Sequence, residues 1–240
     1  MSGHSHWAGI KHKKAITDAK RSKEFSRLAK ELTVAARDGG GDPDSNSHLR
    51  VVLEKARSIN MPTDNTDRAI KRGTGEGQDI QLEEILWEAY GPGNIAILIT
   101  GITDNKNRSL GEIKQTLNTY QGKLVEGGSV RWLFERKGVI TVATGEDSSL
   151  SKEDLELAVI EAGAEDTYWH DEFLDIYTRP EELESVKGKL PQGLSVESAT
   201  LDLVPKEHIQ VTENDVQATE KLFEALDENE AVQEIYSNLV

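Results

Sequence analysis

The pattern of apolar residues changes once along the 240-residue chain, at the glycine-rich segment GTGEGQD, residues 73–79. Before this segment, apolar residues recur every three or four positions, which is typical of amphipathic helices. After it, short apolar runs alternate with helical patterns, as in domains that combine strands and helices. We therefore predict an α+β protein with a helical amino-terminal part, a linker at residues 73–79 and α/β units beyond it.

Three helices are expected before the linker. Residues 13–37 contain neither Gly nor Pro and place their apolar side chains on one side of a helix. Three successive glycines at 39–41 end this helix, and residues 49–59 resume the helical spacing. Residues 63–73 have acidic side chains near their beginning and basic ones near their end, which suits the dipole of a third helix. We predict that residues 1–78 form a domain with a basic tail and three helices.

The composition favours several small domains, because only 36% of the residues are hydrophobic and 5% are aromatic. Residues 138–206 show the order strand, helix, strand, strand, helix, strand of a ferredoxin-like βαββαβ unit. The flanking residues 79–137 and 207–240 are expected to form a second ferredoxin-like unit, into which the first is inserted. Its expected elements are a short amphipathic segment (82–87), a strand (94–103), a helix (108–120), a strand (129–136), a short strand (209–211), a helix (213–227) and a last strand (232–239).

Charge is distributed unevenly between the two parts of the chain. Residues 1–73 contain 15 Lys and Arg against nine Asp and Glu, which is a net charge of +6. Residues 74–240 contain 13 against 34, which is a net charge of −21. A strongly acidic surface repels polyphosphate, so we expect any nucleic acid to bind the amino-terminal part.

Other features of the composition exclude several classes of protein. The chain contains no cysteine, so it has neither disulfides nor thiolate zinc sites. No segment approaches the roughly 20 apolar residues of a membrane span. Residues 1–25 lack the apolar core of a signal peptide. We expect a cytoplasmic protein that has no membrane partner.

The first predicted helix has a basic side opposite its apolar stripe, and the same charge precedes it in the segment KHKK, residues 11–14. Basic side chains bind phosphate as point charges, and an indole can stack on an exposed base. A basic helical face is more often only a solvated surface, and that alternative stays open. The candidate nucleic-acid-binding residues are Trp7, Lys11, Lys13, Lys14, Lys20, Lys23, Arg27, Lys30, Lys71 and Arg72.

No motif for catalysis is present. The chain lacks a G-x-S-x-G elbow, an H-E-x-x-H helix and a Walker lysine, and the triplet at 170–172 lacks the cysteines of a zinc deaminase. His4, His6 and His12 could bind a metal, but no carboxylate accompanies them, so we expect no metal site. We expect no cofactor, no small-molecule substrate and no enzymatic activity. The alternative is an active site in a cleft between the two α/β domains.

Two loops in the acidic part contain more specific residues than a connection requires. They are ITDNKNRS (102–109) and VEGGSVRWLFER (125–136), and four of the 13 basic residues of the acidic part lie in or beside them. One explanation is helix capping by Asp104 or Asn107 and a glycine turn. The other is contact with a ribosome or a partner protein. The residues concerned are Asn105, Lys106, Asn107, Arg108, Glu126, Gly127, Gly128 and Ser129.

Several long motifs in this order resemble one family. They are GHSHWAGIKHKK, NMPTDNTDRAIKRGTGE, YGPGNIAILI, ITDNKNR, EGGSVRWLFERKG and VQEIYSNL. Together they resemble the YebC family, also called the PmpR or probable transcriptional regulatory protein family, over essentially the whole chain. The resemblance implies three domains, with the third inserted in the second. The family commonly has Lys where this chain has His6, and Asn where it has Gly9.

The function that the resemblance implies is divided. The family name implies DNA binding that regulates transcription, whereas a mitochondrial relative is a translational activator of a cytochrome c oxidase subunit. From the sequence we predict a non-enzymatic, nucleic-acid-binding regulator of gene expression, and the family name implies that its partner is double-stranded DNA. The alternative is a ribosome-associated translation factor that binds ribosomal RNA or mRNA and assists elongation. The sequence does not determine the oligomeric state.

Overall fold

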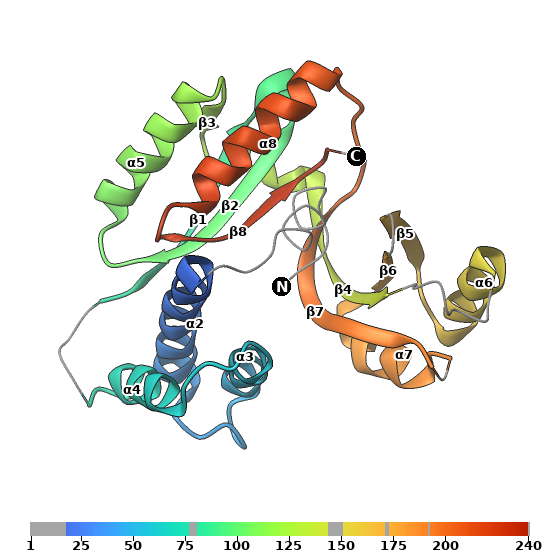
Figure 1. Cartoon of the computed structure of the whole chain (residues 1–240), viewed down its shortest axis with the longest axis horizontal. Helices are drawn as coiled ribbons and strands as arrows, with labels where there is room; N and C mark the ends of the chain where they lie inside the picture. Colours follow the sequence, from blue (N-terminus) through green and yellow to red (C-terminus); the bar gives the residue numbers. More distant parts are fainter. Residues whose placement is uncertain (1–17, 77–80, 144–150, 171–172, 192, 240) are drawn as a thin grey trace.

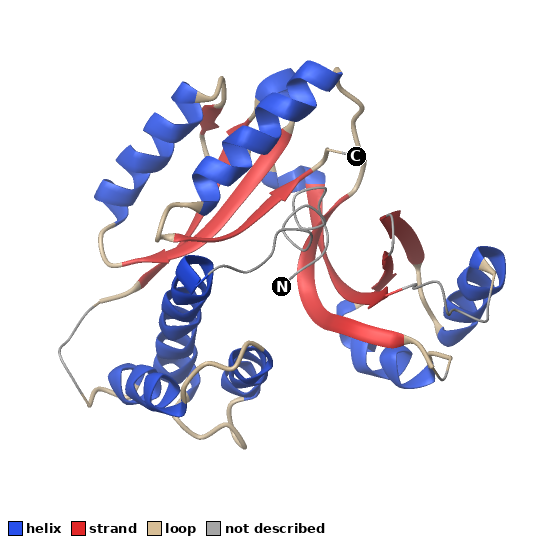
Figure 2. Ribbon diagram, viewed as in Figure 1, coloured by secondary structure: helices blue, strands red, loops and turns tan. Residues whose placement is uncertain are grey.

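A computed structural model describes residues 18–76, 81–143, 151–170, 173–191 and 193–239. It has the predicted α+β class: a group of helices is followed by two four-stranded antiparallel sheets that carry further helices (Figure 1). Helices lie against one face of each sheet (Figure 2). Within the described ranges, no helix is both long enough and apolar enough to cross a bilayer. The predicted domain boundaries at residues 78, 137 and 206 stay predictions.

The three predicted amino-terminal helices are present. They are α2 (Asp18–Gly39), α3 (Ser47–Ser58) and α4 (Thr63–Gly73). Gly40 ends α2 with a φ of 86°, a conformation that costs glycine little. Asn46 caps α3, because its Oδ1 accepts a hydrogen bond from the Leu49 amide at 3.0 Å, and its Nδ2 donates to the Ala35 carbonyl oxygen at 2.8 Å. The apolar faces of the helices meet in a core that includes the fully buried Leu32 and Leu49.

The first sheet has the strand order β3-β1-β2-β8. Its strands are β1 (Glu83–Tyr90), β2 (Ala96–Thr103), β3 (Lys123–Val125) and β8 (Val232–Ser237). Helices α5 (Lys106–Thr119) and α8 (Glu213–Asp227) lie side by side on one face (Figure 1). That face forms the largest core cluster, which includes Ile97, Ile113 and Phe223. On the opposite face, Leu98 packs with Val130.

The second sheet has the order β5-β6-β4-β7 and follows the predicted alternation of strands and helices. Its elements are β4 (Phe134–Ala143), α6 (Lys152–Ala162), β5 (Asp166–His170), β6 (Phe173–Thr178), α7 (Leu183–Lys189) and β7 (Ser195–Pro205). A short helical turn, η3 (Pro180–Glu182), precedes α7. All four strands come from residues 134–205, so this sheet is built from one continuous stretch of the chain.

Three predictions for the first α/β unit are wrong in detail. Residues 129–136 do not form one strand: Arg131–Leu133 is a helical turn (η2), and β4 begins at Phe134 and belongs to the second sheet. Residues 209–211 do not form a strand either, since Ile209 makes only an isolated bridge with Leu239. Most of the segment expected at 82–87 belongs to the longer strand β1. This strand pairs with β2 along its whole length, and the turn η1 (Pro92–Asn94) joins the two.

The physical reason is the same in each case. Short apolar runs have no decisive periodicity, and their conformation depends on the available pairing partner. Strand β1 finds β2 on one side and β3 on the other, whereas residues 129–133 have no strand beside them. The first unit therefore begins with a hairpin of two strands, β1 and β2, and not with the expected strand, helix and strand.

Candidate nucleic-acid interface

Three of the basic residues predicted to bind nucleic acid contact the end of α8. The Arg27 guanidinium donates from Nη1 to Asp227 Oδ1 at 2.9 Å and from Nη2 to the Asp227 carbonyl oxygen at 2.6 Å. The Lys23 amine lies 3.6 Å from the Asp227 carboxylate and 3.4 Å from that of Glu228. The Lys30 amine donates to the Glu230 carbonyl oxygen at 2.7 Å. The start of α2 consequently lies against the end of α8 and the turn into β8 (Figure 1).

This contact has a clear electrostatic cause. The carboxyl end of a helix has a partial negative charge and unpaired carbonyl groups, which attract cations. Asp227 and Glu228 add their own charges at the end of α8. Arg27 is only 3% exposed, so its charge is almost entirely inside this contact. Burial lowers the pKa of the Lys30 amine, and the nearby Glu230 carboxylate offsets this only in part.

The basic side of α2 is therefore not the open surface that helical periodicity indicated. Lys23, Arg27 and Lys30 hold the helical domain against the first α/β unit in this conformation. Their role in nucleic-acid binding stays a prediction. The remaining candidates of this region, Trp7, Lys11, Lys13 and Lys14, lie outside the described residues, as does the side chain of Lys20.

The basic residues at the end of α4 are placed differently. Lys71 and Arg72 are both exposed, and so is Arg68 one turn earlier. In the part of the chain that the structure describes, none of the three forms an ion pair with a carboxylate. These side chains are consequently available for phosphate, and the sequence prediction included Lys71 and Arg72 but missed Arg68. The helical spacing of Arg68 and Arg72, four residues apart, was the signal that could have shown it.

The first candidate loop is organised as a helix cap. The Asn105 Oδ1 accepts a hydrogen bond from the Arg108 amide at 3.0 Å, so Asn105 caps α5, and not Asp104 or Asn107 as expected. The Arg108 guanidinium lies 2.6 Å from the Asp104 carboxylate. Lys106 and Asn107 are exposed in the first turn of α5. Capping thus accounts for Asn105, and an ion pair with Asp104 accounts for Arg108.

Within the second candidate segment, 125–136, the residues between β3 and β4 form a loop, 126–133, that is held by a buried carboxylate. The Glu88 side chain, 4% exposed on β1, accepts hydrogen bonds from the backbone amides of Gly128, Val130 and Arg131 at 2.6, 2.5 and 2.9 Å. Burial opposes the charge of Glu88, but these three hydrogen bonds outweigh it and lower its pKa below the ordinary value. The sequence analysis missed Glu88. Its position between apolar residues of a strand, in LWEAY, was the available signal.

The 126–133 loop presents an aromatic side chain to solvent. Trp132 is 62% exposed, and its Nε1 donates to the Ser129 carbonyl oxygen at 3.0 Å, which orients the ring. Glu126, Gly127 and Gly128 are exposed beside it, and Gly128 has a φ of 89°. An exposed, oriented indole on a loop fixed from below is a suitable surface for stacking on a base or packing on a partner.

Among the described residues, no cluster contains three or more His, Cys, Asp or Glu side chains arranged to hold a metal ion. His4, His6 and His12 lie outside the described residues.

Comparisons with known proteins identify the family. Residues 5–76 match the family description "TACO1/YebC protein N-terminal domain", and residues 82–239 match "TACO1/YebC second and third domain". The chain belongs to the TACO1/YebC family. The resemblance stated from the sequence motifs is thereby confirmed. The division between the two matches lies at residues 77–81, next to the glycine-rich segment at which the sequence pattern changes.

Relatives within the TACO1/YebC family cover nearly the whole chain. A protein of Pseudothermotoga lettingae is 46% identical over 238 residues, which are 99% of this chain and 93% of the relative. A protein of Thermotoga maritima is 46% identical over 239 residues, with the same coverage of each chain. Both bear the name "Probable transcriptional regulatory protein". The crystal structure of a conserved hypothetical protein from Aquifex aeolicus is 42% identical, has a TM-score of 0.85, and matches 98% of this chain and 97% of its own.

Proposed function

We propose that this chain is a cytoplasmic regulator of gene expression that binds nucleic acid through its helical domain and catalyses no reaction. The observation that carries the proposal is the exposed set Arg68, Lys71 and Arg72 at the end of α4, which has no acidic partner among the described residues. Residues 74–240 have a net charge of −21, so phosphate should be attracted to the amino-terminal part, in which these three side chains lie. The names of the relatives support a regulatory role.

The geometry of α4 favours contact with the sugar-phosphate backbone over reading of bases. Helices α3 and α4 are joined by only four residues, 59–62, as in helix-turn-helix proteins, where the beginning of the second helix contacts base edges. Here the beginning of α4 contains the exposed carboxylates of Asp64 and Asp67, which repel DNA phosphates. The basic residues are at the opposite end of the helix. We therefore expect binding that depends strongly on salt and weakly on sequence.

A second candidate function is that of a ribosome-associated translation factor that binds ribosomal RNA or mRNA. The 126–133 loop supports it, because Glu88 fixes a backbone that presents the exposed Trp132. A fixed loop loses little conformational entropy when it inserts into a functional centre. The acidic α/β part suits contact with basic ribosomal proteins.

Crosslinking in living cells, with RNA and DNA recovered and sequenced from the same sample, distinguishes the two. Recovery of discrete promoter DNA with little RNA would support the transcriptional role. Recovery of ribosomal RNA at a few discrete sites would support the translational role. Recovery of neither above background would overturn nucleic-acid binding.

A matched pair of variants tests the assignment of α4. Lys71→Glu should lower the recovery of either nucleic acid several-fold, because it reverses a charge at the proposed interface. Lys221→Glu makes the same charge change at an exposed position of α8 and should leave recovery unchanged. Equal recovery with both variants would contradict the assignment. For the translational role, deletion of Gly127 and Gly128 should preserve ribosome association and abolish the effect on elongation.

A further inference from the structure

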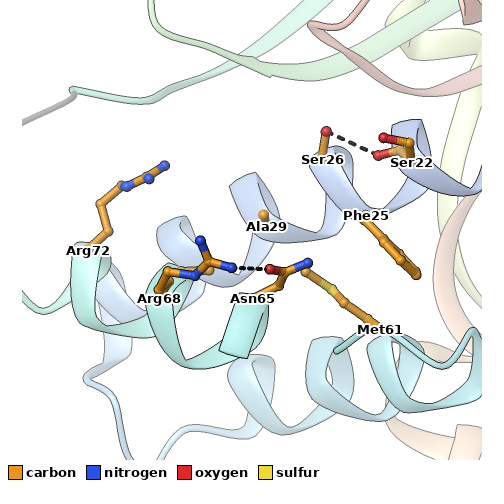
Figure 3. Close-up of a pocket in the computed structure, with 9 residues that line it drawn as sticks. Ser22, Phe25, Ser26, Ala29, Met61, Asn65, Arg68 and Arg72 are labelled. Carbon is orange, nitrogen blue, oxygen red and sulfur yellow. Dashed lines mark hydrogen bonds between the residues drawn. The ribbon is translucent and has the colours of Figure 1, made fainter. Parts of the chain in front are cut away.

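A pocket lies between α2 and α4. It encloses about 270 Å³ and is lined by Ser22, Phe25, Ser26, Ala29, Met61, Asn65, Arg68, Ala69 and Arg72 (Figure 3). Ligand sites for drug-sized molecules start at roughly 300 Å³, so this space suits one group of the size of a nucleotide base and its sugar.

The pocket has a cationic end. Arg68 and Arg72 lie one helical turn apart on α4 and line the same side (Figure 3). Arg68 donates from Nη2 to Asn65 Oδ1 at 2.5 Å and from Nε to the Asp64 carbonyl oxygen at 2.9 Å, which orients its guanidinium. Neither guanidinium forms an ion pair with a carboxylate within the described ranges. Two guanidinium groups that line one pocket and are not paired with a carboxylate suit the binding of a phosphate.

The other end of the pocket is apolar. Phe25 of α2 and Met61 of the connection between α3 and α4 lie there, away from the arginines (Figure 3). Phe25 is only partly buried, so part of its ring surface borders the pocket and not the core. Aromatic rings and thioethers both make favourable contacts with the faces of planar rings. This end is therefore suited to an unpaired base.

We infer that the pocket between α2 and α4 binds one unpaired nucleotide of a single-stranded nucleic acid. Its phosphate lies between Arg68 and Arg72, and its base packs on Phe25 and Met61. This inference rests on the proposed function and names the site through which the helical domain acts. A base inside a duplex is stacked on both faces, so it cannot enter the pocket without leaving the helix.

The helical domain has another groove, which lacks the features that suit the pocket between α2 and α4 to a nucleotide. That groove, about 380 Å³ between α3 and α4, is lined by Arg57 and Lys71 but also by the carboxylate of Asp67. It has no aromatic side chain. A phosphate there would meet a negative charge, and a base would meet no ring on which to stack.

Binding of a short fluorescein-labelled oligouridine to the full chain tests the inference by anisotropy at several salt concentrations. Arg68→Ala with Arg72→Ala should lower the affinity about tenfold or more and reduce the slope of log K against log salt by about 0.7, the value for one lost single-strand phosphate contact. The matched control is Arg50→Ala with Arg57→Ala, two exposed arginines of α3 that do not line the pocket. An equal loss with both pairs would overturn the inference.

The base contact has a separate readout. Phe25→Leu keeps an apolar side chain against the core, so it should preserve the fold, yet it should weaken oligouridine binding about fivefold or more because a base–aromatic contact is lost. Binding to a duplex should not depend on this ring. Oligouridine with 4-thiouridine, irradiated on the wild-type chain, should crosslink to peptides that contain residues 22–29 or 61–72. Crosslinks confined to other peptides would refute the site.

Failure of the inference can be distinguished from failure of the proposed function. If the wild-type chain binds neither oligouridine nor a duplex, both the inference and the proposed function are refuted. If it binds oligouridine but neither Phe25→Leu nor the Arg68 and Arg72 change matters more than the control, nucleic-acid binding stands and the pocket is not its site. If Arg68→Ala with Arg72→Ala weakens binding to a duplex but not to oligouridine, the two arginines hold duplex phosphates and the base-binding role is wrong.

Discussion

Replacement of Arg27 by Ala should destabilise the protein more than the loss of any surface ion pair. Arg27 forms two short hydrogen bonds to Asp227, one to the carboxylate and one to the backbone carbonyl, and its side chain is 4% exposed. Arg27→Ala removes both of these hydrogen bonds from a contact that α2 covers. The two residues are separated by 200 positions, so the change also weakens the attachment of the helical domain to α8.

The magnitude follows from the surroundings of Asp227. Breaking a fully buried ion pair costs about 3–5 kcal/mol, and a hydrogen bond to a charged group contributes about 1.5–3 kcal/mol. The Asp227 side chain is 21% exposed and keeps the Lys23 amine at 3.6 Å, so the cost should lie below the fully buried value. We expect the free energy of unfolding to fall by about 2–3 kcal/mol, and the melting temperature by roughly 4–12 °C for a chain of this size.

Urea unfolding followed by circular dichroism measures this change. Arg179→Ala is the control, because Arg179 also pairs with a carboxylate, that of Glu182, but its side chain is 57% exposed and the change should not be measurable. Arg27→Lys should give an intermediate loss, since a single ammonium group cannot reproduce the forked contact. If Arg27→Ala costs no more than Arg179→Ala, the contact between α2 and α8 does not hold the two parts together.

Three further changes test other parts of the structure. Glu88→Gln should lower the free energy of unfolding by about 1–3 kcal/mol at neutral pH, because an amide accepts fewer of the three hydrogen bonds. Since the pKa of Glu88 in the folded chain lies below its ordinary value of 4.5, this stabilisation is complete above that value and is lost as the pH falls through the folded pKa; urea unfolding of wild type and variant should therefore converge in acid. Gly101→Ala should destabilise by roughly 1–3 kcal/mol or more in the same assay, because its new Cβ would overlap the Ala231 carbonyl oxygen at the irregular pairing of β2 and β8, and an unchanged stability would show that the strands can separate there. Trp132→Ala should change stability by less than about 0.5 kcal/mol, since the ring is 62% exposed, while reducing the effect on elongation if the translational role is correct; normal elongation with this variant would remove the support that the 126–133 loop gives to that role.

In the helical domain, the local spacing of apolar residues was enough to predict the helices. The apolar residues of 13–37 and 49–59 predicted two helices and their buried faces, and Leu32 and Leu49 are fully buried. This succeeded because a run of several turns has a periodicity that only a helix satisfies. The short runs at 129–136 and 209–211 have no such periodicity, and the structure makes neither a strand of the first sheet.

The candidate site was predicted less completely than the fold. Lys71 and Arg72 were identified from composition, and both are exposed. Lys23 and Arg27 were predicted to lie on the basic side of the first helix, and the structure shows that this side contacts Asp227. Periodicity shows which side of a helix a residue occupies, but it does not show what that side meets.

The sequence by itself determined the class of the fold, the position of the change from helices to mixed units, the division of charge and the family. Each of these depends on neighbouring residues or on the order of motifs along the chain. Only the tertiary structure decided that Arg27 pairs with Asp227 across 200 positions, that Glu88 holds the 126–133 loop, and that Phe25 and Arg68 line one pocket. The reason is that these contacts join residues that are distant along the chain, and their choice depends on how whole elements pack and not on any local preference.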